Sequence, residues 1–345
     1  MNQQSFRLVL LGLGHGLNDC IAGYFLGCLV LLNIDALQIG LGLLLYNLLA
    51  FGGQYPVALL LEKMQQPKKM LIFSYALNLS AIILFDLLPQ FSIVLAGIAS
   101  AIYHVAGGSI SAEKNRAASI GIFAAPGVAG LVAGGYFAYS EINILYWLLA
   151  GAIAFLFYFF VVRIDTPKSK IVEERKNNFH VDSHDVVMML LLVFISFRSV
   201  IWNIFQLVHE RQYDWLIAIA AAAFVGKLAG GWLADKIGWK LYSIISLVAA
   251  MPLLSFFKKE MVLFTIGIGL LQSGIPATTS LLITYMKSKT ERAIGLSFGT
   301  TIMAGAIVFY TPARAFLLNN LALAALGLVM LAILYFVRKP SNLHS

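Results

Sequence analysis

Charge is scarce in this sequence. Only 12% of its 345 residues are Asp, Glu, Lys or Arg. A soluble domain of this length needs more charge to cover its surface, so the composition excludes a globular protein surrounded by water. Hydrophobic residues make up 60% of the chain instead. They form repeated runs of about 20 residues, the length that crosses ~30 Å of hydrocarbon as a helix. We therefore expect a membrane protein with many spans.

Cysteine and the common catalytic motifs are scarce or missing as well. The two cysteines, Cys20 and Cys28, lie about 12 Å apart on one expected helix and cannot form a disulfide with each other there. No glycine-rich loop ends in Lys-Ser or Lys-Thr, which argues against ATP as the energy source. No Cys, His or acidic residues have the spacing of metal ligands, and no Ser/His/Asp arrangement appears in the loops. We therefore expect no cofactor, no metal ion and no enzyme activity.

The net charge of +8 is unevenly distributed. Of the 24 Lys and Arg residues, eighteen fall in polar segments on the side of the N-terminus, four fall on the other side, and Arg198 and Lys227 lie inside apolar runs. Because cytoplasmic loops are enriched in Lys and Arg, this pattern predicts two cytoplasmic termini rather than a nucleic-acid-binding surface. The expected spans are about residues 6–32, 36–61, 70–88, 91–112, 117–140, 142–162, 185–208, 213–234, 240–257, 260–286, 293–312 and 317–337.

Two pairs of stretches indicate an internal duplication. Gly53 and Gly226 are each followed nine residues later by an acid, Glu62 or Asp235, and each acid precedes a lysine. An arginine followed by alanine opens both the fifth and the eleventh span, at Arg116 and Arg292. We interpret the chain as an all-α membrane protein of twelve transmembrane helices in two pseudo-symmetric six-helix halves. The expected boundaries are residues 1–163, a cytoplasmic linker at 164–184, and residues 185–345.

The stretch Gly231 to Lys240, GWLADKIGWK, resembles the loop signature between helices 8 and 9 of the major facilitator superfamily. The departure is Trp239, where the superfamily more often has a basic residue. The stretch around Pro126, GIFAAPGVAG, resembles the Gly-Pro motif of the exporting antiporter branch. The resemblance implies a secondary transporter whose halves rock around a site at the membrane midplane. It also implies a cytoplasmic gate built from Gly231, Asp235, Lys236, Lys240 and Pro126, to which Glu62 in the degraded first copy contributes less.

A narrower resemblance involves two further stretches. GHGLND, residues 14–19, and Tyr103-His104 are similar to the fosmidomycin-resistance-like efflux branch. That branch continues the histidine with Pro-Glu, whereas this chain continues with Val105-Ala106. The missing glutamate means that the proton-coupling residues of that branch do not transfer directly.

Five ionisable residues lie deep inside expected spans, where charge is costly and therefore indicates function. They are His15, Asp19, His104, Arg198 and Lys227. His15 and Asp19 are four residues apart and project from one helix face. Imidazole titrates near neutral pH, so we expect His15, Asp19 and His104 to couple transport to protons. Asp19 and Arg198 hold equivalent places in the two halves. They are expected to pair in one conformation, either as a switch or as a permanent structural ion pair.

One central acid against two central bases favours an anionic or zwitterionic solute. The expected solute contacts are Arg198, His104, Tyr103, Asn18, Lys227 and Gln272. We expect a monomeric, proton-coupled exporter of a small organic solute in the lipid bilayer of a bacterial inner membrane. Uptake by a symporter or facilitator on the same fold is the main alternative. A transport-inactive sensor and a membrane-embedded enzyme are the others.

Overall fold

The computed structural model describes residues 3–31, 36–162, 183–208, 212–286, 289–307 and 313–337. All regular structure in these ranges is helical, so the predicted all-α class is confirmed. Most of the predicted linker, residues 164–184, lies outside the described residues.

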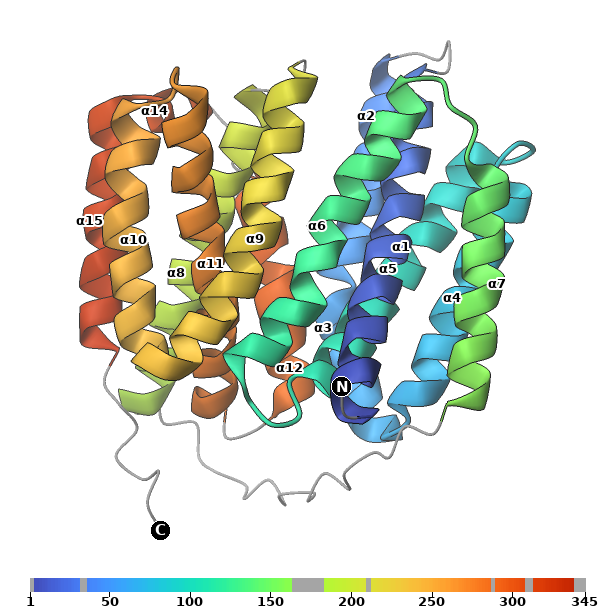
Figure 1. Cartoon of the computed structure of the whole chain (residues 1–345), viewed down its shortest axis with the longest axis horizontal. Coiled ribbons are helices and arrows are strands. Elements are labelled where there is room, and N and C mark those ends of the chain that lie inside the picture. The colour runs from blue at the N-terminus through green and yellow to red at the C-terminus, as the bar shows by residue number, and fades with distance from the viewer. Residues whose placement is uncertain are drawn as a thin grey trace.

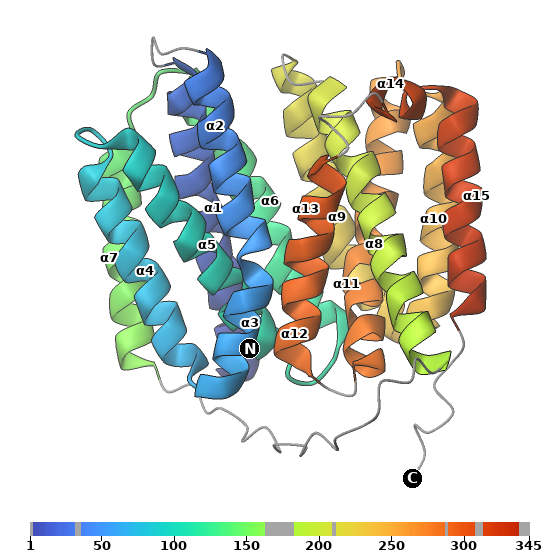
Figure 2. The same cartoon turned by 180° about the vertical axis from the view of Figure 1, so that it is seen from behind.

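The helices form two groups that lie side by side (Figures 1 and 2). The first group holds α1 (Gln3–Leu31), α2 (Ala36–Asn47), η1 (Leu48–Gly52), α3 (Gln54–Met64), α4 (Pro67–Leu84), α5 (Pro89–Ser111), α6 (Ala117–Tyr139) and α7 (Leu145–Val161). The second holds α8 (Ser183–Val208), α9 (Tyr213–Ile237), α10 (Trp239–Phe256), α11 (Met261–Tyr285), α12 (Thr290–Gly295), η2 (Leu296–Thr300), α13 (Thr301–Ile307), α14 (Ala313–Leu317) and α15 (Asn320–Phe336). Each of the twelve expected spans contains helix.

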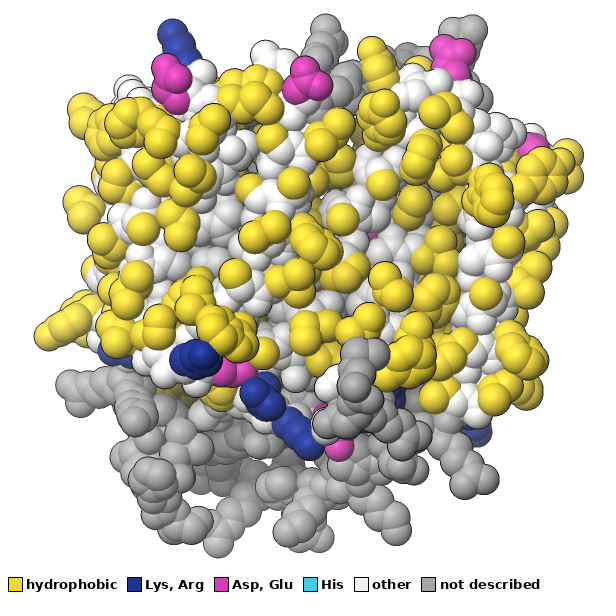
Figure 3. Space-filling model, viewed as in Figure 1, with side chains coloured by type: hydrophobic (Ala, Val, Ile, Leu, Met, Phe, Trp, Pro, Cys, Tyr) yellow, Lys and Arg dark blue, Asp and Glu magenta, His cyan; other side chains and the backbone are white. Residues whose placement is uncertain are grey.

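Eight helices in the described ranges are long and apolar enough to cross a membrane. The helices Leu145–Val161 and Asn320–Phe336 are apolar but shorter. Twelve crossings therefore stay a prediction. Hydrophobic side chains cover a broad band of the surface, and Lys and Arg side chains gather mainly at the end where the N-terminus lies (Figure 3). This distribution agrees with the expected cytoplasmic position of that end.

Local signals set several helix boundaries. Pro67 and Pro89 stand in the first turns of α4 and α5, where a missing N–H costs nothing. Gly238, at φ +100°, makes the turn between α9 and α10 that few other residues tolerate. The Asn319 side chain caps α15 by accepting from the backbone N–H groups of Leu321 and Ala322.

Two π-helical segments interrupt longer helices where the two groups meet. The segment η1 lies between α2 and α3, and η2 lies between α12 and α13. A Cβ on Gly299 of η2 would lie 2.6 Å from both the Phe51 carbonyl oxygen and Gln54 Cβ. The widened turns thus lie where backbone of one group meets the other. Such π-bulges are frequent at functional sites.

Glycines let α6 pack against α1 through backbone. A Cβ on Gly130 would lie 1.9 Å from the carbonyl oxygen of Gly16, and a Cβ on Gly134 would lie 2.1 Å from that of Cys20. No side chain fits at such distances, so the small residues set the spacing of the two helices. Gly231 has the same role between the groups, because its Cβ would lie 2.6 Å from the Ala117 carbonyl oxygen in α6.

This packing predicts a large difference between two glycines of one helix. Gly130→Ala should lower the free energy of unfolding by about 1–3 kcal/mol, because α1 must move away from the added methyl group. Gly135→Ala is the control, since its Cβ would meet only the Gly23 carbonyl oxygen at 3.8 Å. Thermal unfolding of both variants in detergent tests this, and equal midpoints would contradict the packing argument.

Candidate functional site

A cavity of about 550 Å³ lies between the two groups of helices. Its wall combines residues from α1, α2, η1, α5 and α6 with residues from α8, α9, α11, η2 and α13. The polar lining residues are His15, Asp19, Asn47, His104, Arg198, Ser199, Asn203, Lys227, Gln272 and Ser297. All five ionisable residues singled out from the sequence, together with Gln272, therefore meet one space.

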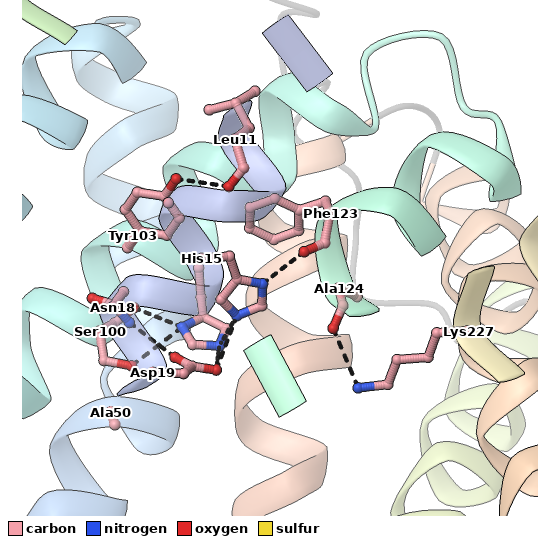
Figure 4. A network of polar contacts seen from close by, with 12 residues as sticks. Leu11, His15, Asn18, Asp19, Ala50, Ser100, Tyr103, Phe123, Ala124 and Lys227 are labelled. Carbon is pink, nitrogen blue, oxygen red and sulfur yellow. Dashed lines mark hydrogen bonds and ion pairs between the residues drawn. The ribbon is translucent and has the colours of Figure 1, made fainter. Parts of the chain in front are cut away.

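His15, Asp19 and His104 form a compact group in this wall, which we call the histidine–aspartate cluster. His15 and Asp19 are labelled in Figure 4. The Nε2 atoms of His15 and His104 lie 2.9 Å apart. Oδ2 of Asp19 lies 3.2 Å from His15 Nε2 and 3.9 Å from His104 Nε2. Two helices, α1 and α5, thus direct three ligand atoms toward one point.

Backbone carbonyls define the tautomers of both histidines. His15 Nδ1 lies 2.8 Å from the Phe123 carbonyl oxygen, and His104 Nδ1 lies 2.8 Å from that of Ser100. A carbonyl oxygen only accepts, so each Nδ1 must carry a hydrogen. In the neutral rings both Nε2 atoms are then acceptors. Two acceptors 2.9 Å apart need a cation between them, and a single shared proton is the simplest one.

The other carboxylate oxygen of Asp19, Oδ1, accepts a hydrogen bond on the side away from the histidines. Asn18 Nδ2 donates to Asp19 Oδ1 at 2.9 Å, and Asn78 Nδ2 donates to Asn18 Oδ1 at 2.9 Å. This chain of amides leaves Oδ2 directed at the two histidines. The Phe123 ring stacks on the His15 ring with 4.5 Å between centroids and restricts its orientation.

Two of the expected solute contacts lie behind the cavity wall. The Tyr103 side chain is fully buried, and its hydroxyl donates to the Leu11 carbonyl oxygen at 2.8 Å. Asn18 is 1% exposed and is used in orienting Asp19. Neither is among the residues that line the cavity. Their neighbours in sequence, His104 and Asp19, reach the cavity because successive residues on a helix point to different faces.

The second group of helices contributes two cations. Arg198 on α8 is 4% exposed and donates from Nη1 to Thr278 Oγ1 at 2.7 Å. Lys227 on α9 reaches across to the Ala124 carbonyl oxygen of α6 at 3.4 Å (Figure 4). In this conformation Asp19 pairs with the histidines and Arg198 with a hydroxyl. The expected Asp19–Arg198 pair therefore stays a prediction for another state.

Several functional candidates were missed from the sequence. Asn47, Ser199 and Ser297 line the cavity, as do the aromatic side chains Phe51, Trp202 and Phe298. A polar residue inside an apolar run is the only signal that the sequence offers for the first three. The aromatic residues carry no such signal, because chains rich in apolar residues place them everywhere.

At the end where the N-terminus lies, an acidic residue from the second group caps a helix of the first. Asp235 on α9 accepts from the backbone N–H groups of Ala117 and Ala118, at 2.9 and 3.0 Å. These are the first residues of α6, whose N-terminal dipole favours a negative charge. Arg116 Nε lies 3.7 Å from Asp235, and Trp239 Nε1 donates to it at 2.9 Å.

A second contact joins the groups near the same end. Arg292 Nε on α12 lies 2.5 Å from Glu62 Oε2 on α3. The next residue back, Glu291, has its pKa raised by burial, with the Glu62 carboxylate as a further cause. We call the Asp235–α6 and Glu62–Arg292 contacts the two latches. Glu62 thus forms a close ion pair between the two groups, although the sequence predicted only a minor contribution from this residue.

Three other predicted gate residues contact their own group of helices. Lys236 lies over the Trp232 ring of its own helix, 3.6 Å from the centroid, and Lys240 donates to the Tyr335 carbonyl oxygen at 3.0 Å. The cations opposite the latch acids are Arg116 and Arg292 instead. Pro126 packs within α6 against α1, where a Cβ on Gly12 would lie 3.3 Å from its ring.

Comparisons with known proteins agree with this architecture. The sequence profile of the Major Facilitator Superfamily matches residues 8–310. No curated protein matches the chain. The fold resembles the crystal structure of the transporter FucP in the outward conformation, with a TM-score of 0.71, 13% identity and coverage of 96% of this chain and 99% of that one. It is similarly close to a variant of the Escherichia coli fucose:proton symporter FucP, with a TM-score of 0.71, 14% identity and 98% coverage of both chains.

The profile match covers most of the chain, and the helical architecture, the cavity between two groups of helices and the latches are consistent with it. The chain is therefore a multi-pass membrane transporter, not an enzyme, and it belongs to the Major Facilitator Superfamily.

Proposed function

We propose that this transporter moves a small anionic or zwitterionic organic solute in a proton-coupled, alternating-access cycle, in a bacterial inner membrane. The two helix groups act as the moving halves, residues 1–163 and 185–345. Export is the direction expected from the Gly-Pro motif around Pro126. The observation that carries the proposal is the pair of facing Nε2 acceptors beside Asp19 in the cavity wall, opposite Arg198 and Lys227.

The proton step is supported by the hydrogen-bond directions in the cluster. With both Nδ1 atoms committed to carbonyls, a proton between His15 and His104 makes the pair cationic, and Asp19 offsets that charge. Loss of the proton leaves two acceptors in contact, which is unfavourable. The pair must then separate or gain another partner, so protonation is linked to the packing of α1 against α5.

The solute step is supported by the cations on the opposite wall. Arg198 has five N–H donors, and one of them bonds the Thr278 hydroxyl. Lys227 makes a long contact with the Ala124 carbonyl oxygen. Among the described residues the Asp19 carboxylate is held by the two histidines and not by either cation, so an anionic group of the solute offsets the cost of burying Arg198 and Lys227. The apolar part of the wall, including Phe51, Trp202 and Phe298, suits a solute with a non-polar body.

Uptake by co-transport with a proton is the second candidate, and the charges favour it. A cation at the cluster and an anion at Arg198 and Lys227 attract each other across one cavity, so each strengthens the binding of the other. The FucP variant that resembles this fold is described as a fucose:proton symporter. The sign of the pH change in proteoliposomes distinguishes the two modes. Solute entry acidifies the lumen in co-transport and alkalinises it in exchange.

Asp19→Asn tests the proton step. The amide keeps the size of the side chain but removes the charge that offsets the shared proton, so solute-dependent proton movement should be abolished in proteoliposomes. Glu113→Gln is the control, because Glu113 pairs with Arg7 outside the cluster, at 3.6 Å. Unchanged proton flux in Asp19→Asn, with normal flux in the control, would contradict the proposed coupling.

Arg198→Ala tests the anion site. Binding of an anionic solute should fall by at least about 10-fold, since a hydrogen bond to a charged group contributes about 1.5–3 kcal/mol. Binding of a neutral analogue should change little. Arg7→Ala is the control for overall charge. Calorimetry with purified protein provides the measurement, and an equal loss for both solutes counts against an anion contact at Arg198.

The latches predict a shift in conformational populations. Asp235→Asn combined with Glu62→Gln weakens both cross-group contacts, so the halves should separate more often at the end where the N-terminus lies. Spin labels at the exposed residues Lys69 and Ile237, in a background without Cys20 and Cys28, report the separation. We expect a larger long-distance population in the double variant than in Arg7→Ala. Identical distance distributions would rule out a latching role.

A further inference from the structure

We propose that His15, Asp19 and His104 form a binding site for a divalent transition-metal ion of the zinc type. The inference goes beyond the transport cycle, because it concerns a cation that the proposed cycle does not use. It rests on the positions of three ligand atoms and on the groups that hold them.

The geometry of the ligand atoms fits such an ion. His15 Nε2, His104 Nε2 and Asp19 Oδ2 form a triangle with sides of 2.9, 3.2 and 3.9 Å. The circle through these three points has a radius of about 2.0 Å, so one position is equidistant from all three at that distance. Bonds from zinc to imidazole nitrogen and to carboxylate oxygen are about 2.0–2.2 Å long. The three distances therefore match those between ligand atoms around one ion.

The groups behind the ligands match those of protein metal sites. Metal-binding histidines usually donate their other ring N–H to a carbonyl or carboxylate, which fixes the tautomer that presents a lone pair to the ion. Both histidines do so here, through Phe123 and Ser100. Asn18 holds the other carboxylate oxygen. Two imidazoles and one carboxylate are the protein ligands in some catalytic zinc sites.

Space for the ion is kept open by Gly127. A Cβ at this position would lie 2.6 Å from His15 Nε2 and 2.7 Å from Asp19 Oδ2. Any larger residue therefore fills the space beside the ligand atoms. All three ligands also line the cavity, which gives the ion a route of entry and an open coordination position. The ion takes the place of the shared proton, so the two occupants exclude each other.

The test is metal binding to the purified full-length chain in detergent, without a polyhistidine tag. The four other histidines, His180, His184, His209 and His344, are replaced by Asn so that they bind no metal. Calorimetry with Zn²⁺ should give one ion per chain. Co²⁺ should produce the visible absorption of a low-symmetry, four- or five-coordinate site. Asp19→Asn and His104→Gln should each weaken binding by more than the about 10–100-fold expected for Asn18→Ala, which only orients a ligand.

Two matched controls separate ligation from general damage. Glu113→Gln removes a carboxylate from the same half and should leave Zn²⁺ affinity unchanged. Gly127→Ala retains every ligand yet should abolish binding, whereas Gly135→Ala on the same helix should not. No zinc-dependent heat in the parent protein overturns the proposal, as does equal affinity in Asp19→Asn and its parent. Because binding is measured without transport, failure here leaves the transport proposal standing, and failure of proton coupling leaves this one.

Discussion

The backbone contact between α1 and α6 is the constraint on which the site depends. Gly130 and Gly134 allow the two helices to approach so closely that no side chain separates them. At this spacing His15 of α1 reaches the Phe123 carbonyl oxygen of α6, and the hydrogen bond determines which ring nitrogen faces the cavity. The same approach places Gly127 beside the ligand atoms. The chemistry of the cluster is therefore a consequence of small residues in helices where size, not polarity, sets the distance.

The two latches join the halves at the end where the N-terminus lies. Each latch sets an acid at the end of one helix against the first turn of a helix in the opposite group, through Ala117 and Ala118 in one case and Arg292 in the other. Such contacts break when two rigid groups rotate, and no core side chain needs to repack. The acids of both latches are partly buried, with 16% of the Asp235 side chain and 28% of the Glu62 side chain exposed.

The parts of the site that could be predicted are those whose residues lie close together in the sequence. The helices, and the presence of His15 and Asp19 on one face, followed from apolar runs and a four-residue spacing. The contact of His104 with both did not, because it joins residues 89 positions apart through the packing of α5 against α1. For the same reason the sequence predicted no metal site: its ligands have no local spacing. The latch residues could be predicted in part, since Arg116 and Arg292 hold matching positions in the duplicated halves. Their pairing could not, because the acidic partner of each arginine comes from the other half.

The positions of His15 and Lys227 bear on how a cation and an anion influence each other. Their side chains contact consecutive carbonyls of α6, those of Phe123 and Ala124 (Figure 4). A positive charge in the cluster therefore lies close to the positive charge of Lys227, because His15 and Lys227 contact neighbouring peptide units. The surroundings screen the repulsion between these two charges only weakly. An anion beside Lys227 and Arg198 removes that repulsion, and by linkage the cation in turn strengthens anion binding. Exchange requires the opposite, a cavity in which each ligand weakens the other. The charge arrangement is thus an argument for co-transport, the second candidate, whereas the motif around Pro126 remains the argument for export.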